Sequence, residues 1–172
     1  LHVFPKAVLL ESANLLLTLH KITRIVVTPS FLQLFDCNKK HFVRMVLLGG
    51  EALKSSTIRK WENQVKLVNA YGPTEATIVF TMGRMSSNIP YVGGIGKPFP
   101  GALVTIMGKG GASEVGIPAQ LCVSGSQVAR GYWYRASQTT SKFVCNTHNS
   151  EPYQRTYNTG DLCRWLPDGT LE

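Results

Sequence analysis

The first half of the chain shows short apolar runs separated by segments with a helical pattern. Such runs, rich in β-branched residues, are typical of strands in a parallel sheet, where both faces are covered. We expect the first of them to be a buried strand. The predicted strands lie at residues 22–27, 42–48 and 65–68.

Helices are predicted before, between and after the first two strands. Leucines recur at helical spacing over residues 9–20. A second helix is expected to be capped near Ser30, and a third to run over residues 54–63 with Ser55 or Ser56 as its cap. The alternation of strand and helix predicts an α/β fold with a parallel sheet, whose chemistry lies in loops at the carboxyl ends of the strands.

The pattern changes at about Ser86, where glycine and proline become frequent and the apolar runs become short. Strands are expected at 102–107 and 120–124, and a hairpin around the Pro-Asp-Gly turn at 167–169. The second half is therefore predicted to be antiparallel or barrel-like. We expect one partial domain over residues 1–172, with an α/β sheet portion at 1–85 and a β-rich portion at 86–172.

The amino-acid composition argues against several classes of protein function. Of the 172 residues 44% are hydrophobic and 16% charged, as in a globular protein, and no apolar run is long enough to cross a bilayer. The net charge is +8, but the basic residues are dispersed and do not interleave with aromatic ones, which argues against nucleic-acid binding. The four cysteines are scattered, without a Cys-x-x-Cys pair, and are typical of reduced thiols in a cytoplasmic protein.

Two segments combine a glycine, a hydroxyl residue and an acid at fixed spacing, and they lie at 69–77 and 157–161. Tyr71 offers a ring to a purine, and Thr74 offers a hydroxyl and a backbone N–H to a phosphate oxygen. Glu75 is a hard oxygen ligand that suits Mg²⁺, and the carboxylate of Asp161 suits the hydroxyls of a sugar. Together they predict an enzyme that handles ATP.

The same residues have a plainer interpretation. Gly-Pro-Thr-Glu is also a helix-start turn, in which Thr74 caps the helix and Glu75 favours its dipole. A second glycine-rich segment, at 93–98, is not a phosphate loop of the Walker type. Tyr91 stands where the first glycine belongs and Pro98 where the metal-binding Ser or Thr belongs.

Seven motifs occur in an order that resembles the adenylation domains of nonribosomal peptide synthetases. These belong with acyl-CoA synthetases and firefly luciferase to the adenylate-forming enzymes. The resemblance covers nearly the whole chain, and Ala-Arg-Gly-Tyr-Trp and Arg-Trp-Leu-Pro-Asp-Gly are closer to the peptide-synthetase branch. The matching motifs lie at 28–30, 48–53, 69–75, 96–98, 121–125 together with 128–133, 142–144 and 157–169.

The resemblance implies roles for single residues. Tyr71 would stack on adenine, in a slot lined by Gly49, Gly50 and the backbone of Ala70. Thr74 would contact the α-phosphate, Glu75 would hold Mg²⁺, and Asp161 would bind the ribose hydroxyls. The implied reaction joins an amino-acid carboxylate to the α-phosphate of ATP and releases pyrophosphate, with catalysis by positioning and charge stabilisation. The acyl group then passes to the pantetheine thiol of a carrier domain.

The resemblance also locates a pocket for the substrate side chain, whose residues are all apolar or small. An apolar pocket is expected to prefer an aliphatic or aromatic amino acid, because a charged side chain would lose its hydration without compensation. The alternative is that these are ordinary core residues. The positions are Val26, Leu47, Gly49, Ala70, Ile78 and Val79.

We expect the chain to be an internal piece of a longer enzyme, with carrier and condensation domains as partners and with no nucleic acid or membrane bound. The upstream phosphate loop and the downstream catalytic lysine of the family do not occur in this sequence, so the piece alone is expected to be inactive and to fold poorly. Two alternatives stay open: an acyl- or aryl-CoA ligase, and a non-catalytic remnant that binds nucleotide.

Overall fold

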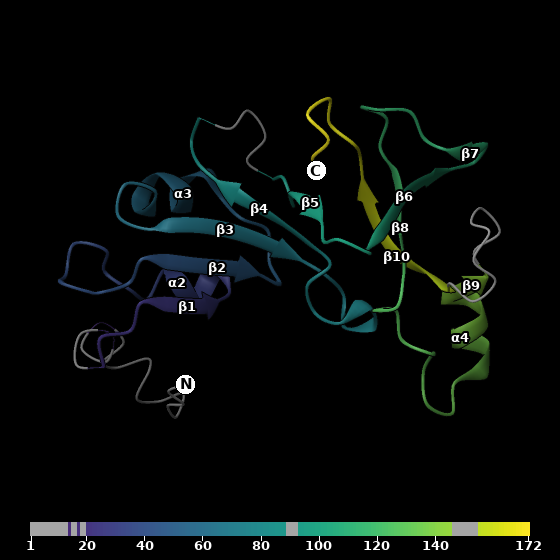
Figure 1. Ribbon diagram of the computed structural model, residues 1–172, viewed down its shortest axis with the longest axis horizontal. Coiled ribbons are helices and arrows are strands. Elements are labelled where there is room, and N and C mark those ends of the chain that lie inside the picture. The colour runs from purple at the N-terminus through teal and green to yellow at the C-terminus, as the bar shows by residue number, and fades with distance from the viewer. Residues whose placement is uncertain (1–13, 15–16, 18–19, 89–92, 146–154) are drawn as a thin grey trace. The chain divides into compact units, whose positions relative to one another are not determined.

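The computed structural model describes residues 14, 17, 20–88, 93–145 and 155–172 (Figure 1). The chain forms two compact units. The first contains residues 1–69 and 84–93, and the second contains residues 70–83 and 94–172. The division into sheet and β-rich portions expected at residue 85 stays a prediction.

The first unit begins with the parallel strands that the apolar runs predict. β1 (Arg24–Val27) pairs in parallel with β2 (Met45–Gly49), and Val26 lies opposite Leu47. β3 (Lys66–Tyr71) follows β2 in a sheet whose strand order is β1-β2-β3-β4-β5. The intervening helices are α2 (Pro29–Leu32) and α3 (Ser55–Trp61). The predicted alternation of strands and helices in this half is thus confirmed.

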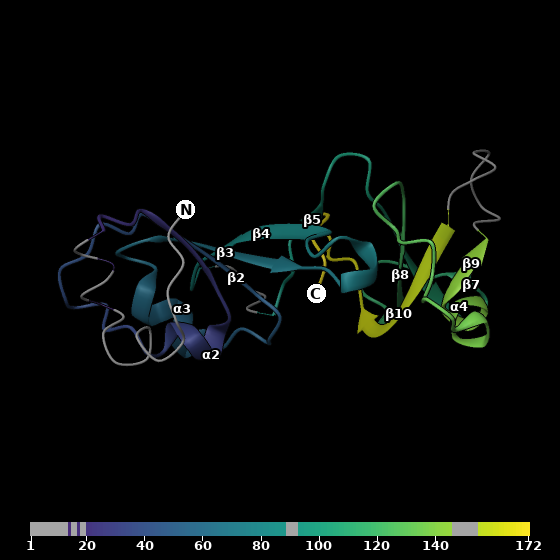
Figure 2. The ribbon, with the colours of Figure 1, turned by 90° about the horizontal axis from the view of Figure 1, so that it is seen from below.

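The core of the first unit lies between this sheet and its helices. α2 and α3 lie on the same face of the sheet (Figure 2). On that face the β2 side chains of Val46 and Leu48 are fully buried, and they share one apolar cluster with Ile58 and Trp61 of α3. Burial of such a stripe is the main force that holds short helices of this kind to a sheet.

The prediction of a fully buried first strand is wrong. Along β1 the side chains alternate between exposed and half-buried, and Val26 is 77% exposed. β1 stands at the end of the strand order, and Ile25 and Val27 are the side chains that pack against the core. The apolar composition of the run therefore reflects burial of one face.

The helix starts differ from the expected ones. Thr28 is the cap of α2, since its side chain accepts a hydrogen bond from the backbone N–H of Phe31, and Pro29 occupies the first helical position, which it favours. α3 begins after Lys54, which makes no side-chain capping bond. Ser55 therefore lies inside the helix, as does the serine that follows it.

Two further differences concern the ends of elements. The helix expected at 9–20 falls mostly outside the described residues, although Asn14 and Leu17 are helical and Leu17 is buried. The third strand does not end at Val68 but continues to Tyr71, because Asn69 and Ala70 are buried and extended like the residues before them. The segment at 69–77, called the first signature below, therefore starts inside a strand and not in a loop. The segment at 157–161 is called the second signature.

The second unit contains an antiparallel sheet, as the short strands and frequent turns predict. Its strand order is β7-β6-β8-β10-β9, and each neighbouring pair is antiparallel. One further helix, α4 (Ala136–Lys142), precedes β9. The strands are β6 (Leu103–Gly108), β7 (Gly111–Ala112), β8 (Ala119–Ser124), β9 (Phe143–Cys145) and β10 (Arg155–Cys163).

β4 (Thr81–Met85) pairs antiparallel with β5 (Lys97–Pro98) at Thr81 and Met82, and these paired residues belong to the second unit. The predicted hairpin at the end of the chain is confirmed by an antiparallel bridge between Trp165 and Leu171. A separate apolar core fills this unit, and its most buried members are Ala76, Phe80, Val123, Leu121 and Leu171.

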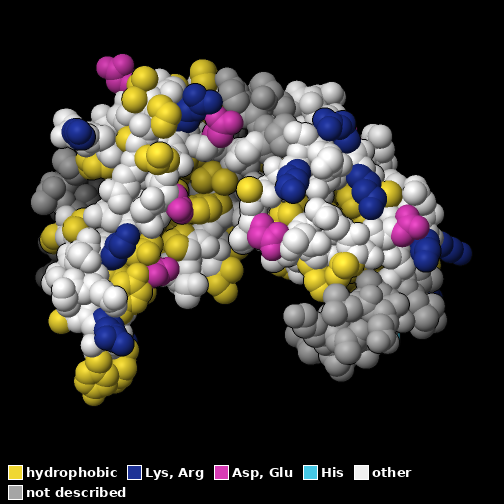
Figure 3. Space-filling model, turned by 180° about the vertical axis from the view of Figure 1, so that it is seen from behind, with side chains coloured by type: hydrophobic (Ala, Val, Ile, Leu, Met, Phe, Trp, Pro, Cys, Tyr) yellow, Lys and Arg dark blue, Asp and Glu magenta, His cyan; other side chains and the backbone are white. Residues whose placement is uncertain are grey.

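Charge is spread thinly over the surface. On the face in Figure 3 the Lys and Arg side chains stand singly, with Asp and Glu side chains among them. On this face the side chains of the described residues form no continuous basic track. In the part of the chain that the structure describes, no helix has the length and apolar character needed to span a membrane.

Candidate functional site

The first signature begins within the last residues of β3. Tyr71 is the last residue of the strand and Gly72 begins the turn. A Cβ atom on Gly72 would lie 2.5 Å from the carbonyl oxygen of Ile78 and 2.7 Å from the nitrogen of Phe80. The Phe80 N–H donates to the Tyr71 carbonyl at 2.7 Å. Glycine is therefore required here because the chain returns on itself within contact of its own backbone.

Beyond the turn, residues Thr74–Ala76 form one turn of 3-10 helix. Pro73 is the cap residue, and no side chain caps this helix, so Thr74 does not have the capping role of the plainer interpretation. Thr74 is exposed, and Glu75 lies half-buried in the first turn. The hydroxyl and the carboxylate thus stand on adjacent residues directly after the strand that carries Tyr71.

The segment then passes through two strained residues. Thr77 and Ile78 both have left-handed backbones, with φ of 59° and 66°. Each β-branched residue in this region costs about 1–2 kcal/mol. The Thr77 hydroxyl donates to the carbonyl of Gln127 at 2.8 Å, which helps to hold the turn. Ile78 is 74% exposed, and the next residue, Val79, is half-buried.

The second signature meets the first within the same unit. The Tyr71 hydroxyl donates to Oδ2 of Asp161 at 2.5 Å, although 90 residues separate them. Burial of the ring, followed by this hydrogen bond, raises the pKa of Tyr71. Asp161 itself is exposed, and its backbone N–H donates to the Thr159 hydroxyl. An aromatic ring and an accessible carboxylate are therefore adjacent, as a site for a base and its sugar requires.

Glu75 is held by a residue that sequence reasoning did not select. The Tyr132 hydroxyl donates to Oε1 of Glu75 at 2.6 Å and lies 3.3 Å from the hydroxyl of Tyr157. The hydrogen bond from Tyr132 lowers the pKa of Glu75, so its carboxylate is charged at neutral pH. Both tyrosines lie in motifs that carried the resemblance, but no spacing in the sequence indicates that they meet Glu75.

The donor set around Glu75 fits Mg²⁺. Among the described residues there is no cluster of three or more His, Cys, Asp or Glu side chains that would hold a metal alone. Mg²⁺ is usually bound by one or two carboxylates together with substrate phosphates and water. A single charged, partly accessible carboxylate beside Thr74 meets that requirement, and oxygen Oε2 is not engaged by Tyr132.

Gly49 and Gly50, which are predicted to line the adenine slot, lie at the carboxyl end of β2 in the first unit. Gly49 ends β2, and Gly50 follows with a left-handed φ of 80°. Glu51 then accepts hydrogen bonds from the N–H and the hydroxyl of Ser30, at 2.9 and 2.7 Å. These bonds lower the pKa of Glu51 and connect the end of β2 to the start of α2.

The pocket positions differ in exposure. Val26 and Leu47 are register partners on β1 and β2, and Leu47 is half-buried whereas Val26 is 77% exposed. Ala70 is buried in β3, and Ile78 is exposed. Val26 and Ile78 are therefore exposed in this structure, and the pocket role of the six positions stays a prediction.

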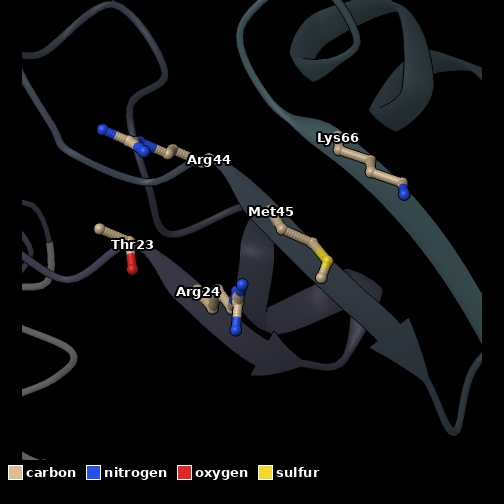
Figure 4. Close-up of a pocket in the computed structure, with 5 residues that line it drawn as sticks. All are labelled: Thr23, Arg24, Arg44, Met45 and Lys66. Carbon is tan, nitrogen blue, oxygen red and sulfur yellow. The ribbon is translucent and has the colours of Figure 1, made fainter.

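A hollow in the first unit lies at the opposite, amino end of the strands (Figure 4). Its volume is about 380 Å³, and Arg24, Met45 and Lys66, which line it, are the first residues of β1, β2 and β3. Figure 4 shows the Arg44 side chain pointing away from those of Arg24 and Lys66. The cations do not converge on one point, and the hollow is separate from the signature residues.

Comparison with known proteins gives matches along most of the chain. The family model described as AMP-binding enzyme matches residues 1–133. Chondramide synthase cmdD of Chondromyces crocatus is 35% identical over 99% of this chain, and gramicidin S synthase 1 of Brevibacillus brevis is 35% identical over 88%. A probable non-canonical nonribosomal peptide synthetase, CymA of Salinispora arenicola, is 36% identical over 89%. The chain spans 5%, 14% and 2% of the lengths of these relatives.

Proposed function

The chain belongs to the AMP-binding enzyme family, and from this membership we propose that it acts as part of an amino-acid-activating adenylation domain in a peptide synthetase. The three relatives named above are synthases or synthetases, and the chain covers a small part of each. The proposal concerns the reaction of the longer protein to which these residues contribute.

The reaction has two steps. An oxygen of the amino-acid carboxylate attacks the α-phosphorus of ATP, and the bond to pyrophosphate breaks, which leaves an aminoacyl-adenylate. The thiol of a carrier domain's pantetheine then attacks the acyl carbon, and AMP leaves. No protein nucleophile is needed, so the residues of this chain act by positioning and by charge.

The roles follow the chemistry of the side chains. Tyr71 stacks on adenine, Asp161 accepts hydrogen bonds from the ribose hydroxyls, and Thr74 donates to the α-phosphate. Glu75 holds Mg²⁺, which supplies neutralisation of phosphate charge when it is bound. Gly49, Gly50 and the backbone of Ala70 line the adenine slot, as the family resemblance implies.

The contact between Tyr71 and Asp161 is the observation that most strongly supports the proposal. The Tyr71 hydroxyl and the Asp161 carboxylate are within 2.5 Å, and Thr74 and Glu75 follow Tyr71 by three and four residues. Groups suited to a base, a phosphate and a metal therefore occur on one short segment, and the group suited to a sugar is in side-chain contact with it. A non-catalytic remnant that binds nucleotide would use the same groups, so turnover decides between the two interpretations.

The substrate is proposed to be an aliphatic or aromatic amino acid. The six pocket positions offer no charged or hydrogen-bonding side chain to a charged substrate, whose burial would be unfavourable. Carrier and condensation domains of the same megaenzyme are the proposed partners. These positions are Val26, Leu47, Gly49, Ala70, Ile78 and Val79.

The test is ATP–pyrophosphate exchange by the full-length protein that contains this chain, over a panel of amino acids. Apolar amino acids are expected to give the highest exchange. Asp161→Asn is expected to raise the KM for ATP by about 10- to 100-fold, because a hydrogen bond to a charged group is worth about 1.5–3 kcal/mol. Asp168→Asn, in the exposed hairpin turn, is the matched control and should leave the KM unchanged.

The result also separates the alternatives. Exchange that occurs with aryl or fatty acids and not with amino acids would assign the protein to the CoA-ligase branch. Binding of ATP without exchange for any acid would indicate a non-catalytic nucleotide-binding protein. A preference for acidic or basic amino acids would overturn the proposed substrate class and leave the reaction intact.

A further inference from the structure

Tyr132 makes a hydrogen bond to Glu75 that has no role in the reaction proposed above. Its hydroxyl donates to Oε1 of Glu75 at 2.6 Å across 57 residues of sequence. We propose that Tyr132 is a positioning residue, which holds the Glu75 carboxylate in one orientation and leaves its second oxygen for Mg²⁺. This inference rests on the proposed function, because it concerns the Mg²⁺ ion that would bind together with ATP.

The loop that carries Tyr132 is attached to the Glu75 segment at three points. The Ala129 N–H donates to the backbone carbonyl of Glu75 at 2.8 Å, and the carbonyl of Gln127 accepts from the Thr77 hydroxyl at 2.8 Å. The Tyr132 hydroxyl makes the third contact. Backbone and side chain of Glu75 are thus both bound to residues 127–132, so the loop fixes where the carboxylate points.

The position of Tyr132 is itself determined by its neighbours. Its backbone N–H donates to the Thr139 hydroxyl of α4 at 3.0 Å, and its ring packs edge-on against Phe143 with centroids 5.3 Å apart. Gly131 has a φ of 144°, and a Cβ there would lie 2.4 Å from Thr139. The tyrosine therefore cannot move freely, which is what a residue that orients another one requires.

The hydroxyl of Tyr157 completes the arrangement. This tyrosine is buried, and its oxygen lies 3.3 Å from that of Tyr132. When the Tyr157 hydroxyl donates to the Tyr132 oxygen, the Tyr132 proton points to Glu75. The carboxylate, as an acceptor, favours this direction. The two phenols thus lie beside each other, and both interact with the Glu75 carboxylate.

The test replaces Tyr132 by phenylalanine in the full-length protein, which keeps the ring and removes the hydroxyl. The Mg²⁺ concentration that gives half-maximal exchange is expected to rise by 10- to 100-fold, the usual effect of losing an outer partner of a metal ligand. Exchange at saturating Mg²⁺ should recover most of the wild-type rate. A merely structural role would lower the rate at all Mg²⁺ concentrations and would not be rescued.

Binding of the metal ion is measured separately from the exchange reaction. Mn²⁺ affinity in the presence of ATP and without amino acid, followed by the electron paramagnetic resonance of free Mn²⁺, should fall by a similar factor in Tyr132→Phe. Tyr134→Phe is the matched control, since Tyr134 lies two residues away and is 89% exposed, and it should match wild type. In Glu75→Gln, the further change Tyr132→Phe should have no additional effect.

The outcomes distinguish this inference from the proposed function. Wild-type protein that exchanges pyrophosphate, together with unchanged Mg²⁺ and Mn²⁺ dependence in Tyr132→Phe, would overturn the positioning role alone. Additive effects of the Tyr132 and Glu75 substitutions would also overturn it. If wild-type protein binds Mn²⁺ with ATP but activates no amino acid, the proposed function fails while the binding test of Tyr132 still applies.

Discussion

The tight turn at Gly72 gives the sharpest prediction about stability. In Gly72→Ala the added Cβ would meet two backbone atoms, the Ile78 oxygen at 2.5 Å and the Phe80 nitrogen at 2.7 Å. Neither contact can be relieved by rotating a side chain, so residues 78–80 must move away. Overpacking of this kind costs about 1–3 kcal/mol, and loss of the hydrogen bond from Phe80 to Tyr71 adds about 1 kcal/mol. The total is about 2–4 kcal/mol.

The assay is hydrogen–deuterium exchange of the peptides that cover residues 70–83 in the full-length protein, because it reports local opening. A loss of 2–4 kcal/mol corresponds to about 30- to 1000-fold faster exchange of the Phe80 amide. Gly110→Ala is the control, since nothing lies within 4 Å of its Cβ position. Equal exchange of the Phe80 amide in both variants would refute the reasoning, because the close approach would then be unimportant.

Two predictions concern titration and reactivity. Burial and the bond to Asp161 raise the pKa of Tyr71, so its stabilising effect is complete below pH 10 and is lost as the pH rises through the folded-state pKa. Its phenolate absorbance, identified by difference from Tyr71→Phe, should appear at lower pH in Asp161→Asn; an unchanged midpoint would contradict this. Cys145 is exposed, whereas burial raises the pKa of the Cys163 thiol to about 11, so maleimide labelling followed by mass spectrometry should modify Cys145 much faster. Equal labelling rates at native pH would be the opposite outcome.

The sequence predicted the order of elements well because each depends on local pattern. Short β-branched runs became β1, β2 and β3, and the Pro-Asp-Gly turn became the terminal hairpin. The patterns were less informative about ends. β3 continues through Asn69, which is buried among neighbouring strands and the core. A polar side chain such as that of Asn69 does not by itself indicate a buried strand position.

The hydrophobic pattern of the sequence could not predict which strand is exposed or which distant residues are in contact. The apolar run at 22–27 predicted a buried strand, yet Val26 is exposed, because composition cannot tell an end strand from a central one. The pairing of Tyr71 with Asp161 was expected from the chemistry that each supplies. The contact between Glu75 and Tyr132 was not, since it depends on how a loop 57 residues away is folded.

The two consecutive left-handed residues at 77 and 78 have a consequence for sequence variation. Part of their strain belongs to β-branching, so an unbranched L-residue in place of the exposed Ile78 is expected to keep the left-handed backbone with less strain. Glycine or asparagine is the exception, since either relaxes the backbone and removes the reason for its fixed course. The side chain at position 78 can thus vary while the path of the polypeptide stays constant.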